Sequence, residues 1–269
     1  MYLADYHTHT KFSFDSKEEP EKLCQMAIEK GLKAIAITDH FDCNYDDYEY
    51  PLVFNTLERK ELIYKLKEKY KGKLDVIYGV ELGQPHSRPE IARQLLNDGE
   101  FEFVIGSLHN LRALPDFYYF DYTKTKGRIL NVLIKKILKE TTEIIEFGGI
   151  DTLAHLTYVH RYVKAAGNDI DFKTFYDDID NIYKLLIKND ISLEINTSTL
   201  WKGYGFSMPN DELLKLYYEC GERLITVGSD AHSGENVGGC VEEAYSKLKS
   251  LGFKETTVII NGKKELVSL

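Results

Sequence analysis

Residues 32–40 are Leu32-Lys33-Ala34-Ile35-Ala36-Ile37-Thr38-Asp39-His40, a short apolar run that closes on three polar residues. An apolar run of this length without alternation is typical of a parallel strand that is buried on both faces. The polar triplet falls where such a strand would leave its sheet. The stretch therefore predicts a buried parallel strand with reactive side chains at its carboxyl end.

Six other segments repeat this pattern, and each is followed by a helical pattern or by a loop that leads to one. The seven predicted strands end near His7, His40, Glu81, His109, His155, Asn196 and Asp230. Ser16 and Glu19 predict a capping box for the first helix, and Gly31 marks its end. Near the carboxyl terminus, residues 257–260 form an apolar run that could be an extra strand.

Strands and helices that alternate with short connections predict a parallel sheet covered by helices. Seven units favour an α/β fold, a distorted (βα)7 TIM-like barrel. An open doubly wound sheet is the alternative, but it normally binds its ligand at one switch point. Here metal-binding residue types lie at or just beyond six strand ends, and a barrel gathers all such ends at one mouth. We expect one domain over residues 1–269, since no linker or repeat divides the chain.

Composition excludes several classes of protein. With 43% hydrophobic and 29% charged residues the chain is an ordinary globular one, and its net charge of −9 argues against a nucleic-acid-binding surface. The four cysteines contain no Cys-x-x-Cys pair, so neither a disulfide framework nor a thiolate zinc site is indicated. We see no basic-then-apolar leader and no membrane-spanning apolar run, and we expect a cytoplasmic protein.

Two histidines near the amino terminus suggest a metal site. His7 and His9 follow a short apolar run, and residues i and i+2 of a strand point to the same face. Both imidazoles can therefore reach one point in space. A lone His-x-His pair could equally be two structural or surface histidines. The rest of the chain decides, because six of its eight histidines fall at the predicted strand ends.

These six histidines and three carboxylates make a set of potential ligands that suits two or three metal ions. The set is His7, His9, Asp15, His40, Glu81, His109, His155, Asp230 and His232. One buried histidine is more often a core residue bonded to a backbone carbonyl, but six together are hard to explain that way. Imidazole and carboxylate ligands without thiolate fit zinc, manganese or iron.

The same residues resemble the successive motifs of the PHP (polymerase and histidinol phosphatase) superfamily of metal phosphoesterases. The resembling motifs are His7-Thr8-His9-Thr10 with Asp15, Thr38-Asp39-His40, Gly79-Val80-Glu81, Gly106-Ser107-Leu108-His109, the His155 segment and Ser229-Asp230-Ala231-His232. They run through nearly the whole chain. Within the superfamily, the chain is most similar to the stand-alone histidinol-phosphate phosphatases, whose fold is a distorted (βα)7 barrel with a trinuclear site.

The resemblance implies hydrolysis of L-histidinol phosphate to L-histidinol and phosphate, in histidine biosynthesis. It places one metal on His7, His9, Glu81 and Asp230, a second on Glu81, His109 and His155, and a third on Asp15, His40 and His232. A hydroxide bridging the first two metals is expected to attack phosphorus in line, while the third orients the phosphate. No family ligand position is missing. The alternative is a phosphoesterase acting on nucleotides or another small phosphate ester.

Other residues are candidates for catalysis or substrate binding. Asp39 is a possible donor of the leaving-group proton, as is a metal-bound water, but Asp39 could instead orient a ligand histidine. Arg161 could fork onto phosphate oxygens or lie in solvent. The acidic and aromatic loop 41–50 could receive a cationic, ring-bearing leaving group. The predicted substrate contacts are Arg161, Asp42, Phe117, His160 and Ser198.

Two further alternatives differ in class. A metal-dependent amidohydrolase would usually have a carbamylated lysine at a strand end, and no lysine occupies such a position. A non-catalytic barrel would show lost ligands, and none is lost. We therefore expect a small phosphate ester as the partner, with no nucleic acid and no membrane; a homo-oligomer is possible.

Overall fold

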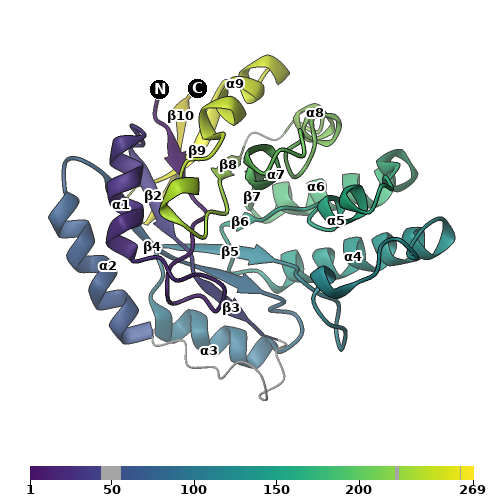
Figure 1. Cartoon of the computed structure of the whole chain (residues 1–269), viewed down its shortest axis with the longest axis horizontal. Helices are drawn as coiled ribbons and strands as arrows, with labels where there is room; N and C mark the ends of the chain where they lie inside the picture. The colour runs from purple at the N-terminus through teal and green to yellow at the C-terminus, as the bar shows by residue number, and fades with distance from the viewer. Residues whose placement is uncertain (44–55, 222–223, 261) are drawn as a thin grey trace.

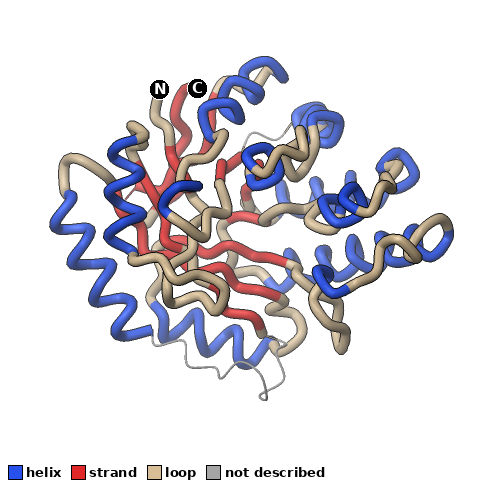
Figure 2. The backbone as a smooth tube through the Cα atoms, viewed as in Figure 1, coloured by secondary structure: helices blue, strands red, loops and turns tan. Residues whose placement is uncertain are grey.

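Seven parallel strands form the centre of the molecule in the computed structural model, which describes residues 1–43, 56–221, 224–260 and 262–269 (Figures 1 and 2). The strands, in hydrogen-bonded order, are β1 (Ala4–Asp5), β2 (Ala34–Ile37), β4 (Asp75–Gly83), β5 (Phe103–Ser107), β6 (Thr152–Leu153), β7 (Ser192–Asn196) and β8 (Ile225–Gly228). Residues 44–50 of the predicted acidic loop lie outside the described residues.

The first and last strands meet through backbone hydrogen bonds. Tyr6 N donates to Val227 O at 2.9 Å, and His9 N donates to Ala231 O at 2.8 Å. All neighbouring pairs in the sheet are parallel. The predicted (βα)7 TIM-like barrel is therefore confirmed. A short strand, β3 (His40–Asp42), follows β2 and pairs with the far end of β4, so that His40 lies opposite Glu81.

Alternate strand residues face two different cores. In β2, Ala34 and Ala36 belong to a small cluster made almost wholly of strand residues, whereas Ile35 and Ile37 belong to the large cluster that includes the helices. Successive side chains of a strand point to opposite faces. The small cluster therefore fills the barrel, and the large one joins the barrel to its helical cover.

Helices surround the barrel (Figure 1). They are α1 (Pro20–Glu29), α2 (Thr56–Tyr70), α3 (Pro89–Gly99), α4 (Arg128–Phe147), α5 (His160–Ala165), α6 (Tyr176–Lys188), α7 (Ser198–Trp201), α8 (Asp211–Glu219) and α9 (Val241–Leu251). Three short 3-10 turns, η1 (Phe117–Tyr119), η2 (Phe172–Phe175) and η3 (Gly234–Asn236), lie in the connections. Among the helices of the described residues, none combines the length and the hydrophobicity that spanning a bilayer requires.

The predicted capping box of the first helix is wrong. α1 begins at Pro20 with Glu19 as its N-cap, and no side chain caps it. Proline suits this first position because it has no backbone N–H to satisfy. Ser16 is used elsewhere: its hydroxyl donates to the carbonyl oxygen of His232 at 2.9 Å. The residue thus holds a loop of the barrel mouth instead of a helix end.

The apolar run near the carboxyl terminus forms a hairpin. Strand β9 (Glu255–Ile260) pairs antiparallel with β10 (Lys263–Ser268). Val258 and Ile259 join the cluster inside the barrel, and Ile259 N donates to the hydroxyl of Tyr6 at 2.9 Å. Thr256 donates to the carbonyl of Ile225, the first residue of β8. The hairpin therefore covers the amino-terminal end of the barrel and leaves the carboxyl-terminal mouth open.

Candidate metal centre

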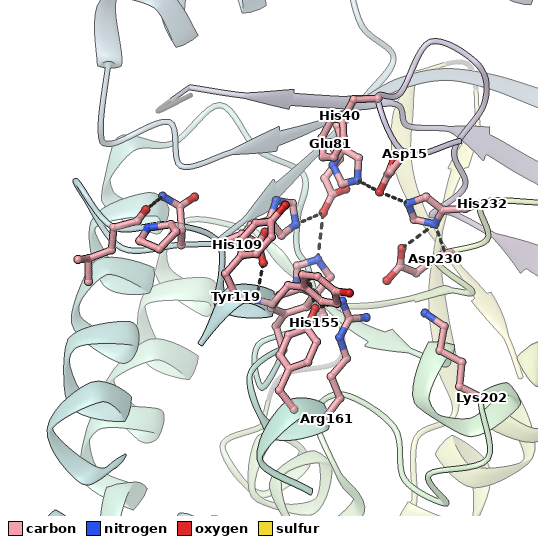
Figure 3. Close-up of a pocket in the computed structure, with 18 of the residues that line it drawn as sticks. Asp15, His40, Glu81, His109, Tyr119, His155, Arg161, Lys202, Asp230 and His232 are labelled. Carbon is pink, nitrogen blue, oxygen red and sulfur yellow. Dashed lines mark hydrogen bonds and ion pairs between the residues drawn. The ribbon is translucent and has the colours of Figure 1, made fainter. Parts of the chain in front are cut away.

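The side chain of Glu81, near the end of β4, lies at the centre of the predicted ligand set (Figure 3). Its Oε2 atom is 3.2 Å from His7 Nε2, 3.4 Å from His9 Nε2 and 2.9 Å from His40 Nδ1. The three histidines come from the ends of β1 and from β3. One carboxylate oxygen therefore faces three imidazoles from the same side of the mouth.

The other oxygen of Glu81 faces a second pair of histidines. Oε1 is 3.1 Å from His109 Nε2 and 3.0 Å from His155 Nε2. Asp230, just beyond β8, completes the first group, with its Oδ1 atom 3.6 Å from His9 Nε2. A carboxylate placed between two groups of imidazoles has the geometry of a bridging ligand.

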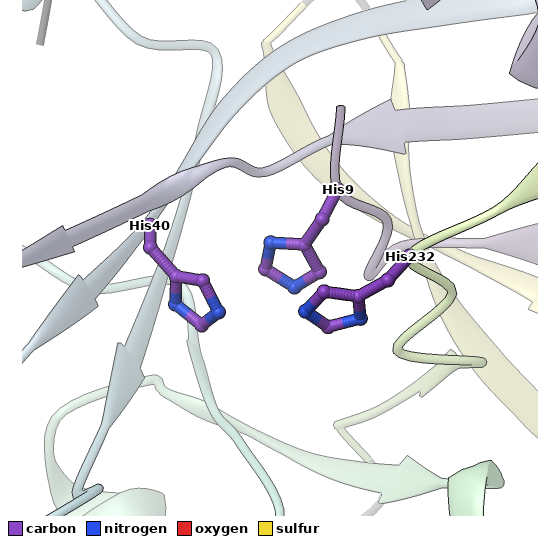
Figure 4. Close-up of side chains that lie close together, drawn as sticks. All are labelled: His9, His40 and His232. Carbon is purple, nitrogen blue, oxygen red and sulfur yellow. The ribbon is translucent and has the colours of Figure 1, made fainter. Parts of the chain in front are cut away.

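A third group lies at the outer edge of the mouth. Asp15 Oδ2 is 2.9 Å from His232 Nε2 and 3.6 Å from His40 Nε2. The rings of His40 and His232 both lie against His9 at centroid distances of 4.2 Å and are 5.8 Å from each other, so all three imidazoles lie together (Figure 4). The structure thus brings all nine predicted ligand residues together.

The unsatisfied polar atoms of this cluster test whether a metal fits. His7 Nε2, His9 Nε2, His40 Nδ1 and Glu81 Oε2 are buried, and they have no hydrogen-bond partner in the described part of the chain. Leaving such atoms unpaired is costly, and a bound cation removes the cost. Burial, together with the facing His232 and His40, lowers the pKa of His9 well below its usual range. This shift favours the neutral ring that a metal ligand needs. For His7 and His40 burial acts in the same direction, but the charges of Glu81 and a second carboxylate beside each ring outweigh it and raise the pKa.

Hydrogen bonds to Glu194 fix the orientation of two of these histidines. His7 Nδ1 lies 2.7 Å from Glu194 Oε1, and the other oxygen of Glu194 accepts a bond from His155 N at 2.9 Å. Partners of this kind turn the opposite ring nitrogen toward the metal. Gly228 allows the approach, because a Cβ atom there would lie 2.4 Å from His7 Cβ and 2.5 Å from Glu194 Oε1.

Replacing Glu194 with Gln is expected to weaken metal binding by about 10- to 100-fold with the fold retained, because the amide is a weaker acceptor for His7 Nδ1–H. Metal retained after titration with a chelator measures the effect. Glu242→Gln, on the exposed face of α9, is the matched control. Equal metal retention in Glu194→Gln and the native protein would contradict this role.

Asp39 belongs to a buried network and not to the open mouth. It is fully buried, and its carboxylate accepts from Arg59 Nε at 2.5 Å, Thr10 N at 2.5 Å and Ser13 Oγ at 3.2 Å. Ser13 in turn accepts from His40 N at 3.0 Å. The hydroxyl proton of Ser13 is used on Asp39, so His9 Nδ1–H must donate to Ser13, at 3.1 Å.

This tautomer leaves His9 Nε2 as the ligand atom. Asp39 is therefore placed to position His9 and His40, as one of the two predicted alternatives had it. It does not line the cavity, so the structure does not place it to protonate a leaving group. Sequence reasoning missed Arg59, because nothing distinguishes a buried arginine from the exposed ones in a helical pattern.

Two of the predicted ligand residues have strained backbones. His155 has φ +26° and Asp230 has φ +56°, in the left-handed region that residues other than glycine rarely adopt. Such conformations cost about 1–3 kcal/mol each and persist where the surrounding structure imposes them. Both residues sit where the chain leaves a barrel strand. Both side chains line the cavity at the mouth.

A cavity of about 870 Å³ opens above the ligand cluster (Figure 3). Two cations among the described residues line it, Arg161 from α5 and Lys202 just after α7. The guanidinium of Arg161 lies 4.0 Å from the ring centre of Tyr158, and it donates to the hydroxyl of Tyr162 at 2.6 Å. Although burial opposes the charge, these phenols and Asp230 raise the pKa of Arg161, which stays a cation.

The prediction for Arg161 thus agrees with its place on the cavity, and Lys202 was missed. The only signal for Lys202 was its position six residues beyond the sixth strand. Burial lowers the pKa of Lys202. Four tyrosines and Phe14 also line the cavity, and all four tyrosines follow the strand ends that carry His109 and His155.

The other predicted substrate contacts lie elsewhere. Asp42 is buried, with Oδ1 3.0 Å from His109 Nδ1, and it therefore orients a predicted ligand residue. Phe117 is buried beneath the cavity against Tyr158. His160 pairs with Asp169 at 2.8 Å, and Ser198 donates to Asn196 Oδ1 at 2.6 Å. None of these four residues lines the cavity. Their positions after strands were right, but their side chains turn into the protein.

A parallel barrel with clustered histidines and carboxylates at its mouth defines a metal-binding α/β barrel protein. The family model described as PHP domain matches residues 5–198, and the chain belongs to this family. A relative from Thermotoga maritima named probable histidinol-phosphatase is 32% identical over 97% of both chains. A histidinol-phosphatase from Lactococcus lactis is 28% identical over 95% of this chain and 93% of its own.

Solved structures agree with these relatives. The crystal structure of histidinol phosphate phosphatase from Lactococcus lactis, complexed with zinc, L-histidinol and phosphate, has a TM-score of 0.85. It is 26% identical, and the match covers 98% of this chain and 99% of that one. A putative histidinol phosphatase from Listeria monocytogenes, 19% identical with a TM-score of 0.77, shows the same fold.

Proposed function

We propose that this protein is a histidinol-phosphatase, which hydrolyses L-histidinol phosphate to L-histidinol and phosphate. The observation that carries the proposal is the cavity, where seven of the nine predicted ligand residues share one lining with Arg161 and Lys202. The other two, His7 and His9, are buried against Glu81. The resemblance to the Thermotoga maritima and Lactococcus lactis proteins over nearly their full lengths supports the substrate. A role in histidine biosynthesis follows from that substrate.

We propose the three metal positions that the family resemblance implies, and the short distances between their residues at the mouth support them. The residues that would hold them are His7, His9, Glu81 and Asp230 for the first, Glu81, His109 and His155 for the second, and Asp15, His40 and His232 for the third. When bound, such ions would lower the pKa of a water molecule so that it can act as the nucleophile, and they would neutralise charge on the phosphoryl oxygens. Zinc, manganese and iron suit these donors.

Arg161 and Lys202 supply fixed positive charge for the phosphate. In Figure 3 both side chains point toward the ligand cluster, Lys202 on the Asp230 side and Arg161 beside His155. A guanidinium held between Tyr158 and Tyr162 is oriented before substrate arrives, so little entropy is lost on binding. The ammonium group of Lys202 can donate a proton, and burial lowers its pKa. It is therefore better placed than Asp39 to protonate the leaving oxygen.

Replacing Arg161 with Lys is expected to lower kcat/KM for L-histidinol phosphate by about 10- to 100-fold, because lysine cannot fork onto two phosphate oxygens. Steady-state kinetics on samples of equal metal content measure the loss. Arg128→Lys, exposed at the start of α4, is the control. A change in kcat/KM of less than about threefold would show that Arg161 does not bind the phosphate.

The substrate is tested by comparing kcat/KM for L-histidinol phosphate, nucleoside monophosphates and p-nitrophenyl phosphate. We expect L-histidinol phosphate to be preferred by a factor of hundreds, about 3 kcal/mol of discrimination in the transition state. If a nucleotide has the highest kcat/KM, the proposed substrate is wrong, but the proposed phosphoesterase chemistry is retained. The alternative of a nucleotide substrate is not favoured by the formal charge of −9.

Several broader predictions stay proposals. We propose that residues 1–269 act as one domain in the cytoplasm on a small phosphate ester, with no nucleic-acid or membrane partner. The interlocking of the terminal hairpin with the barrel core supports a single domain. A homo-oligomer stays a prediction that sedimentation would test.

A further inference from the structure

Asp116, on the loop after β5, is a carboxylate in the cavity that serves no metal position. Among the described residues that line the cavity, the other carboxylates are Asp15, Glu81 and Asp230, which all belong to the ligand set. Asp116 Oδ1 accepts from Tyr118 N at 2.7 Å. Within the described part of the chain, no cation lies within ion-pair distance of Asp116. The cavity thus contains a negative group for which the catalytic chemistry has no use.

The positive charge of Lys202 and the negative charge of Asp116 come from different sides of the cavity. Lys202 lies on the Asp230 side, while the loop that carries Asp116 follows the His109 strand end, and Tyr119 from this loop lies on the His109 side in Figure 3. Arg161 is engaged with Tyr158 and Tyr162 and does not pair with Asp116. A ligand with a phosphate at one end and a cation at the other therefore matches the cavity.

The environment of Asp116 also favours a cationic partner. Burial raises the pKa of its carboxyl group, although the charges of His109 and Arg161 oppose the rise. A carboxylate that has lost water in this way gains most from a charged hydrogen-bond donor. Next to it, Tyr118 and Tyr119 line the cavity although their side chains are about 67% and 70% exposed. Exposed phenol rings at a rim can stack on a planar ring or face an ammonium group.

We propose that Asp116 binds the ammonium group of the leaving amino alcohol, while Tyr118 and Tyr119 contact its ring. The inference rests on the proposed phosphatase function and names the residue that selects among phosphate monoesters. The metal cluster and the two cations bind any phosphate ester. Asp116 makes the enzyme prefer esters whose alcohol is positively charged. Asp42, the carboxylate predicted for this role, is instead bonded to His109.

The test compares Asp116→Asn with the native enzyme on two substrates. One is L-histidinol phosphate, and the other is 3-(imidazol-4-yl)propyl phosphate, which differs only in lacking the amino group. Asparagine keeps the side-chain oxygen that caps Tyr118 N, so the loop is preserved. Asp121→Asn is the matched control, because Asp121 accepts from Thr123 N in the same kind of turn but does not line the cavity.

We expect Asp116→Asn to lower the ratio of kcat/KM for the amino ester over the deamino ester by about 10- to 100-fold, the effect of one charged hydrogen bond. The Ki of L-histidinol should rise with it. Asp121→Asn should leave the ratio within about threefold of the native value. An unchanged ratio in Asp116→Asn, or an equal loss on both substrates, would overturn the proposal.

The same data separate this inference from the proposed function. If the native enzyme prefers L-histidinol phosphate but Asp116→Asn leaves the ratio unchanged, the function stands and the role of Asp116 is wrong. If another charged ester is preferred and the ratio still falls, Asp116 keeps its role and the substrate is wrong. If the native enzyme hydrolyses neither ester, both are wrong.

Discussion

Replacing Glu81 with Gln is expected to lower phosphate release by about 10³-fold or more and to deplete the protein of metal. Glu81 offers one oxygen to His7, His9 and His40 and the other to His109 and His155. Glutamine has a single acceptor oxygen, and its NH₂ group would face ring nitrogens or a cation. The variant would therefore lack the second carboxylate oxygen that bridging of the two proposed metal positions requires.

Metal analysis and kinetics on the same sample measure this effect. Glu90→Gln, exposed in the first turn of α3, is the control and should retain native activity and metal content. Because Glu81 is packed among five histidines, circular dichroism should first show that the variant is folded. Native turnover in a folded Glu81→Gln protein would show that the site does not depend on Glu81.

The second large effect is on stability. Replacing Arg59 with Met is expected to lower the free energy of unfolding by about 3–5 kcal/mol, the usual cost of leaving a buried charge without its partner. Arg59 is fully buried; its Nε donates to Asp39 at 2.5 Å, and its Nη2 donates to the carbonyls of Ile37 and Gly79 at 2.7 Å. The side chain therefore ties α2 to both β2 and β4.

Urea unfolding followed by circular dichroism measures the loss. Lys60→Met is the matched control, because Lys60 is the next residue of α2 and pairs with Glu100 at the surface. Exposed pairs of this kind contribute little. Arg59→Met should also weaken metal binding, since Asp39 holds Ser13 and through it His9. If the urea midpoint of Arg59→Met equals that of Lys60→Met, the buried Arg59–Asp39 pair does not stabilise the barrel.

The fold and the ligand set could be predicted because both follow from local patterns. An apolar run such as residues 34–37 identifies a buried strand, and the polar residues after it identify the strand end. Once seven such strands form a barrel, their ends must meet, so His109 and His155 come together although 46 residues separate them. The ligand set could therefore be predicted without knowing the conformation of any of its side chains.

The substrate contacts could not be predicted in the same way. Chain position shows that a residue follows a strand, but it does not show which face of the loop meets the cavity. Phe117 and Asp116 are neighbours, yet the ring is buried in the core and the carboxylate lines the cavity. Ser16 was misassigned for a similar reason, because its hydroxyl had a partner in the His232 loop far along the chain.

The most direct test of a metal-dependent phosphatase is phosphate release from L-histidinol phosphate during metal reconstitution. The protein is stripped with a chelator and titrated with zinc, manganese or iron(II), and bound metal is measured on every sample. We predict that the stripped protein is inactive and that turnover returns as metal binds, saturating at about three ions per chain. Full turnover in the stripped, folded protein would contradict the account.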